Sequence, residues 1–158
     1  MDGVLPDPVA RVKGALNALG AGDTVTVFDS KVPTAAAAAA ALGCDVAAIT
    51  NSLVFDVGGA PLLILASGAA RVDVRKVAGQ LGGGQIRRAS AEFVLEHTGQ
   101  EVGGVAPVGH PEKIRTLLDE SLKVHELLWA GAGDHHSMFS ITYEELKRIT
   151  EAKEMSVR

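Results

Sequence analysis

The chain has 158 residues, of which 47% are hydrophobic and 22% charged, and its formal net charge is −4 at pH 7. This apolar content can bury a core, which excludes an intrinsically disordered chain, and the single cysteine excludes an internal disulfide framework. No apolar run approaches the roughly 20 residues that a membrane helix needs, and the acidic balance argues against a surface that coats nucleic acid broadly. We therefore expect one domain over residues 1–158 that works in the cytoplasm without contacting a membrane.

The N-terminal part of the chain predicts a helix, a strand and a second helix. Residues 8–19 repeat apolar side chains at helical spacing, and Gly20 follows where such a helix would end. Residues 24–29 alternate and are rich in β-branched side chains, which is typical of a strand. Thr34 then precedes a run of seven alanines, residues 35–41. This pattern predicts a capped helix whose small side chains allow close packing against a neighbour.

The centre of the chain predicts a β-hairpin. Residues 49–57 and 61–66 are apolar and strand-like, and residues 56–60 (DVGGA) supply the glycines of a tight connection. A short connection joins antiparallel strands, whereas parallel neighbours need crossovers of a dozen or more residues. The sequence therefore argues against an all-parallel sheet.

Helices and strands alternate through the second half. Asp73 and Ser90 are expected to cap two short helices, and Thr142 a last helix through Ile149. The charged tail, residues 151–158, is expected to fray. Further short strands are expected at residues 86–88, 114–118, 126–130 and 138–141. The whole order predicts a mixed α+β fold, with a curved, barrel-like sheet flanked by helices.

A loop rich in glycine and proline is the most unusual segment. Its glycines let backbone N–H groups approach a ligand closely, and its proline stiffens the middle, so the loop could present fixed donors to a carbonyl or phosphate oxygen. The alternative is a tight connection with no ligand. No Walker motif or dinucleotide-binding glycine motif is present. The loop consists of Gly103, Gly104, Val105, Ala106, Pro107, Val108, Gly109 and His110.

Other candidate chemistry is sparse. The five histidines have no metal-ligand spacing, so we expect neither a metal site nor a cofactor. Cys44 has no visible activating partner and is interpreted as a buried small residue. Residues 71–88 contain one acid and five bases, with a local charge of +4, which suggests a phosphate-facing patch or simply a solvated helix face. The five bases are Arg71, Arg75, Lys76, Arg87 and Arg88.

Three segments taken together resemble one known family. They read VPTAAAAAAALGCDVAAITNSLVF, APLLILASGAARVDVRKVAGQLGG and GGVAPVGH, and their landmarks are Gly104, Pro107 and Gly109, preceded by an R-x-D-x-x-K pattern at Arg71. Over Val25 to Ile149 the chain is similar to the YbaK/ProX family of aminoacyl-tRNA editing domains. The resemblance implies a free-standing hydrolase of the ester that joins a wrong, small amino acid to tRNA, with mischarged tRNA and an aminoacyl-tRNA synthetase as partners.

The resemblance also assigns roles to residues. Where the family has a lysine in a K-[ST]-L context, this chain has Asn51, which can donate a hydrogen bond but carries no charge. We expect Asn51 to orient the ester carbonyl or a phosphate, and the amides of residues 105–109 to hold the amino acid or the terminal ribose, while water attacks without a metal. The alternative is an inactive member that binds the tRNA 3′ end, a nucleotide or an aminoacyl ligand.

Overall fold

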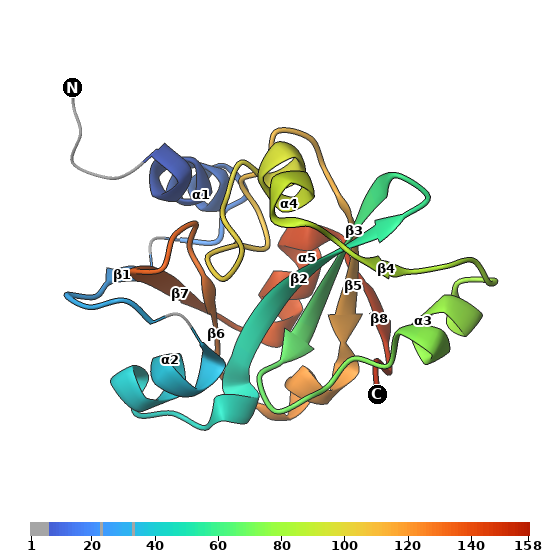
Figure 1. Ribbon diagram of the computed structural model, residues 1–158. Coiled ribbons are helices and arrows are strands. Elements are labelled where there is room, and N and C mark those ends of the chain that lie inside the picture. Colours follow the sequence, from blue (N-terminus) through green and yellow to red (C-terminus); the bar gives the residue numbers. More distant parts are fainter. Residues whose placement is uncertain (1–6, 23, 33) are drawn as a thin grey trace.

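The computed structural model describes residues 7–22, 24–32 and 34–158 (Figure 1). Within these ranges the helices are α1 (Asp7–Ala18), α2 (Ala35–Leu42), α3 (Val74–Gln80), α4 (Ala91–Thr98) and α5 (Tyr143–Thr150), with short 3-10 turns η1 (Val46–Ala48) and η2 (Glu120–Val124). The strands are β1 (Val25–Val27), β2 (Ile49–Val57), β3 (Ala60–Ser67), β4 (Arg87–Arg88), β5 (Arg115–Asp119), β6 (Leu128–Gly131), β7 (Ser137–Ile141) and β8 (Lys153–Met155).

The strands form one mixed sheet in the order β1-β7-β6-β2-β3-β5-β8, and β4 pairs separately with β2. The predicted hairpin of β2 and β3 is antiparallel, whereas β6 runs parallel to β2 and β5 runs parallel to β3. Figure 1 shows the strands fanning into a twisted sheet, with α2 and α3 at opposite ends. The sheet is open, with β1 and β8 at its edges. The predicted mixed α+β fold is confirmed.

Local capping explains where the helices begin and end. Thr34, Ser90 and Thr142 each accept a hydrogen bond from a backbone N–H in the first turn of α2, α4 and α5. Gly43 and Gly99 adopt φ of 68° and 72° at the ends of α2 and α4, a left-handed conformation that favours glycine. These boundaries agree with the sequence expectations. No helix in the described ranges has the length and apolar character needed to cross a membrane.

The two faces of the sheet bury separate cores because side chains alternate along β3. Leu63 and Leu65 pack in one core with side chains of α1, α4, α5 and the loop after α4. Leu62 and Ile64 pack in the other, against α3 and the C-terminal segment. A third, smaller cluster lies under the alanine-rich helix α2. The loop after α4 is therefore part of the main core, which fixes its position relative to β2.

The expectation that residues 151–158 fray was wrong. Within this segment β8 pairs in parallel with β5, and Met155 and Val157 are buried in the core next to α3. The carbonyl of Val157 accepts a hydrogen bond of 2.6 Å from the N–H of Asp73, just before α3. The tail is ordered by contacts with segments that lie far away in sequence. Its charged composition predicts fraying because these contacts, made by the two apolar residues buried next to α3, leave no local pattern.

Candidate functional site

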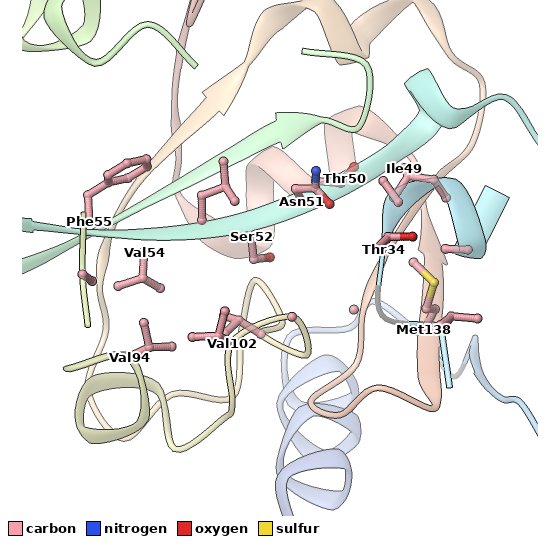
Figure 2. A pocket seen from close by; sticks show the side chains of 18 of the residues that line it. Thr34, Ile49, Thr50, Asn51, Ser52, Val54, Phe55, Val94, Val102 and Met138 are labelled. Atoms are coloured by element: carbon pink, nitrogen blue, oxygen red, sulfur yellow. The ribbon is translucent and has the colours of Figure 1, made fainter. Parts of the chain in front are cut away.

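A cavity of about 640 Å³ runs along β2 (Figure 2). Its walls come from β2, from the beginning of α2, from the segments on both sides of α4, and from the turn between β6 and β7. In Figure 2, Ser52 and Val54 project from β2 toward Val94 and Val102, whereas Phe55 lies on the opposite side of the strand. The cavity is therefore built from segments that lie far apart in the sequence.

The cavity lies where one edge of β2 has no neighbouring strand. In the described chain, β6 pairs with β2 at Ile49 and Thr50, and β4 pairs with it at Phe55 and Asp56. Between these ladders, residues 51–54 pair with β3 alone. The sheet therefore splits along this short stretch, and the cavity occupies the split.

The alternation of hydrogen bonding along β2 determines which of its backbone N–H and carbonyl groups face this gap. The N–H of Gly68 donates to the carbonyl of Ile49 at 2.7 Å, which marks the two residues as a hydrogen-bonded antiparallel pair. Because such pairs alternate along a ladder, Asn51 and Leu53 direct their backbone groups toward β3. Ser52, lying between them, directs its N–H and carbonyl away from β3 into the gap.

Two hydroxyl groups beside the gap are buried without a partner. The side-chain oxygens of Thr50 and Ser52 have no hydrogen-bond partner among the described residues, although both residues line the cavity and Thr50 is only 2% exposed. Buried polar groups in folded proteins are nearly always satisfied, by protein or by water. These hydroxyls therefore make this wall suited to a polar ligand or to ordered water.

The cavity carries one charged group of each sign among its described lining residues. Asp134 lies in the turn between β6 and β7, and Arg88 lies in β4. The Oδ1 atom of Asp134 accepts a hydrogen bond of 2.9 Å from the N–H of His136, which holds the carboxylate in place. The site can therefore receive a ligand that carries both a cationic and an anionic group.

The glycine-rich loop contributes to the cavity through part of its length. Gly103 and Val105 line it, as does Asn51 on β2. Gly104 is buried, and a Cβ atom placed on it would lie 2.9 Å from the backbone of Asp134. Gly109 has φ of 87°, and its Cβ would lie 3.0 Å from the side chain of Val12 in α1. The loop thus faces the cavity at its beginning and packs against α1 at its end.

The middle of the loop is fixed by hydrogen bonds to the buried side chain of Gln100 and the half-buried side chain of His110. The N–H of Ala106 donates to Oε1 of Gln100 at 2.7 Å, and its carbonyl pairs with Nε2 of His110 at 2.8 Å. Gln100 is 1% exposed. Burial lowers the pKa of His110, an effect that its hydrogen bond to Ala106 opposes. Ala106 therefore uses both backbone groups within the protein, and His110 acts as a support for the loop.

The five basic residues do not converge on the cavity. Arg88 is the one among them that lines it. The Nζ atom of Lys76 donates to the carbonyl of Arg158 at 2.7 Å, so it ties α3 to the C-terminal segment. The other three, Arg71, Arg75 and Arg87, are exposed. A role for these residues in binding phosphate stays a prediction.

The remaining reactive groups offer no alternative centre. Burial raises the pKa of the Cys44 thiol, which is the opposite of what activates a nucleophile. In the described part of the chain, no three His, Cys, Asp or Glu side chains gather as metal ligands would.

Sequence reasoning did not single out Thr50, Ser52, Asp134 or Gln100 as site residues. For the first two, a signal was available: the polar run Thr50-Asn51-Ser52 interrupts a strand that is otherwise largely apolar. Asp134 lies in a turn that meets β2 only through the fold of the sheet, so its place at the cavity does not follow from the local sequence. Gln100 likewise acts on a loop that follows it in sequence, through a contact that spacing does not reveal.

Comparison with known proteins gives consistent results. The sequence profile of the aminoacyl-tRNA editing domain matches residues 29–149. The protein YwhH of Bacillus subtilis (strain 168) is 35% identical over 130 residues, which are 82% of each chain. A proline–tRNA ligase of Bacillus licheniformis is 32% identical over 135 residues, which are 79% of this chain but 24% of the ligase. The crystal structure of a candidate trans-editing enzyme for prolyl-tRNA synthetase has a TM-score of 0.92 and 37% identity, and 98% of both chains is covered.

Proposed function

Because the chain belongs to the aminoacyl-tRNA editing domain family, we propose that it is a deacylase that hydrolyses the ester between a wrong amino acid and its tRNA. The observation that carries this proposal is the cavity at the unpaired stretch of β2, whose lining includes Asn51, Gly103 and Val105. The enzyme acts in trans, in the cytoplasm, where charged tRNA is made and used.

The substrate is tRNA for proline that carries a smaller, non-cognate amino acid. This part of the proposal is supported by the names of the relatives, which include proline–tRNA ligases and a candidate trans-editing enzyme for prolyl-tRNA synthetase. The end of the cavity next to α2 is lined by Ala35, Ala38, Ile49 and Met138. Such an apolar wall selects by size, a discrimination of about 1–3 kcal/mol per methylene.

The charges and donors of the cavity suit the two ends of an aminoacyl ester. The α-ammonium group pairs with the carboxylate of Asp134, and the side-chain amide of Asn51 donates to the ester carbonyl. A water molecule then attacks the carbonyl carbon, the bond between that carbon and the ribose oxygen breaks, and the ribose oxygen takes the proton that the water gives up. Arg88, at the β4 side of the cavity, attracts the tRNA backbone, and mischarged tRNA is thus the macromolecular partner.

A second candidate function rests on Asn51. An asparagine stabilises a developing oxyanion less than a lysine does, because its amide carries no charge. A chain with this substitution would bind the tRNA end, or a nucleotide or aminoacyl ligand, without hydrolysing it. The two candidates differ in a single observable, which is turnover.

Deacylation of tRNA for proline charged with alanine, cysteine or serine separates them. We expect the wild-type protein to hydrolyse at least one of these esters, and Asn51→Ala to lower kcat by roughly 10- to 100-fold because one hydrogen bond to the carbonyl is lost. Asn51→Lys should retain or raise activity. Turnover that occurs only in Asn51→Lys, together with binding by the wild type, would establish the silent binding protein instead.

A further inference from the structure

The exposed main chain of β2 offers a more specific prediction about how the substrate is held. Ser52 directs its N–H and carbonyl into the cavity, and no strand of the described chain pairs with it on that side. A residue in an antiparallel hydrogen-bonded pair gives one N–H and receives one hydrogen bond on its carbonyl. The N–H and carbonyl of Ser52 are thus oriented as in such a pair, but no described residue lies opposite them to complete it.

An α-aminoacyl group has the complementary pattern. Its amino nitrogen is a donor and its carbonyl oxygen an acceptor, and both sit on the same α-carbon unit, as in a peptide residue. In an ester of tRNA no peptide precedes the amino group, so the unit needs an exit from the gap on its carbonyl side alone, where the ribose is attached. A single residue can therefore fit the gap of residues 51–54, in which a whole strand has no room.

We propose that the main-chain N–H and carbonyl of Ser52 bind the α-aminoacyl group of the substrate as a one-residue extension of the sheet. This inference rests on the proposed function and specifies how the same site recognises an amino acid irrespective of its side chain. The N–H of Ser52 donates to the ester carbonyl, and its carbonyl accepts from the α-ammonium group. Asp134 can bind the same ammonium group, which has three donors.

Two hydroxyls at the proposed contact have no partner among the described residues. The side-chain oxygens of Thr50 and Ser52 are buried and make no hydrogen bond within the described chain. Side chains two residues apart share one face of a strand, so both hydroxyls lie on the same side of the bound aminoacyl group. Buried polar groups are nearly always satisfied, so this stretch of β2 is exceptional in its side chains as well as in its main chain.

Binding of a stable substrate analogue tests this contact. The probe is 3′-(L-alanylamino)-3′-deoxyadenosine, whose amide replaces the labile ester, and the comparison ligand is the propionyl analogue, which lacks the amino group. With the ¹⁵N-labelled wild-type protein, we expect the alanyl probe to slow hydrogen exchange of the Ser52 amide. We expect the propionyl analogue to bind roughly tenfold more weakly.

Matched variants separate the main chain from the side chain. Ser52→Ala and Ser52→Pro both remove the hydroxyl, but only the proline removes the N–H. Since that N–H makes no ladder bond, proline is tolerated there as it is on an edge strand, whereas Leu53→Pro breaks the pairing with β3 and should unfold the protein. Ser52→Pro should bind the probe roughly tenfold more weakly than Ser52→Ala.

Equal affinity of Ser52→Ala and folded Ser52→Pro for the probe would overturn the proposal. It would also be overturned if bound probe left the hydrogen-exchange rate of the Ser52 amide unchanged, or if the wild type did not bind the probe. If Ser52→Pro does not fold, the effect of the probe on hydrogen exchange of the Ser52 amide in the wild type decides whether the contact exists. Deacylation of mischarged tRNA is measured separately. If the protein hydrolyses mischarged tRNA but the probe does not slow exchange of the Ser52 amide, the deacylase function holds and this contact is wrong. If the probe slows the exchange but no hydrolysis occurs, the contact holds and the deacylase function is wrong.

Discussion

Gly104→Ala is expected to lower kcat/KM for the mischarged tRNA by about 100-fold. It is also expected to lower the free energy of unfolding by about 1–3 kcal/mol. The added Cβ would lie 2.9 Å from the backbone of Asp134, so the glycine-rich loop and the turn between β6 and β7 must move apart. Both segments line the cavity. A small displacement there misplaces the ester relative to Asn51 and Asp134.

Gly14→Ala is the matched control for this prediction. Gly14 lies in α1 with nothing within 4 Å of its added Cβ, so alanine should leave activity unchanged and stabilise the helix by roughly 0.5–1 kcal/mol. Denaturant unfolding and steady-state deacylation measure both variants. Wild-type activity in Gly104→Ala would show that the close approach of loop and turn is irrelevant to the site.

Asp134→Asn is expected to lower kcat/KM by about 10- to 100-fold, because a charge-assisted hydrogen bond to the α-ammonium group becomes a neutral one. The asparagine oxygen can still accept the hydrogen bond that Asp134 receives from His136, so the turn should keep its shape and the protein its stability. The loss should appear mainly in KM, since the ammonium group is bound equally in the ground state and the transition state.

Glu92→Gln removes a carboxylate of equal charge from the exposed first turn of α4 and controls for the change in net charge. It should leave both kinetic constants unchanged. If Asp134→Asn behaves like Glu92→Gln, the ammonium group is bound elsewhere, and the orientation proposed for the ester is wrong.

The parts of the fold that depend on local chemistry could be predicted from the sequence. Thr34, Ser90 and Thr142 begin helices because their side chains satisfy the first N–H groups, and the glycines after α2 and α4 end them. The hairpin of β2 and β3 follows from two apolar runs around a short glycine turn. In each case, the residues that determine the feature lie within a few positions of it.

The features that form the cavity could not be predicted in this way. The gap beside residues 51–54 exists because β6 and β4, which come from distant parts of the chain, each pair with a different end of β2. Strand pairing between distant segments leaves no local pattern. The order of residues 151–158 escapes sequence-based prediction for the same reason, since β8 forms by pairing with the distant strand β5.

For the site itself, the resemblance pointed to Asn51, and the glycine and proline content pointed to the loop, but neither could divide the loop by role. The structure places Gly103 and Val105 at the cavity, whereas Gly104 and Gly109 allow close packing against Asp134 and α1. A glycine that lines a ligand site and a glycine that permits close packing look identical in sequence. Only the surrounding contacts distinguish them.

Single-turnover release of alanine from alanine-charged tRNA for proline tests whether the ester is hydrolysed in the cavity beside β2. Wild type, Val102→Trp and Val124→Trp are each used in excess over the tRNA. Val102 is 56% exposed and lines the cavity opposite Ser52 (Figure 2), so an indole there should block the site without disturbing the core. Val124 is 82% exposed at the end of η2, outside the cavity lining.

We expect wild type and Val124→Trp to release alanine at the same rate, well above hydrolysis in buffer. Val102→Trp should be slower by about tenfold or more, because the ester no longer reaches its productive position. Equal rates for all three proteins would contradict the location of the site, and a wild-type rate no higher than that of buffer would contradict the activity.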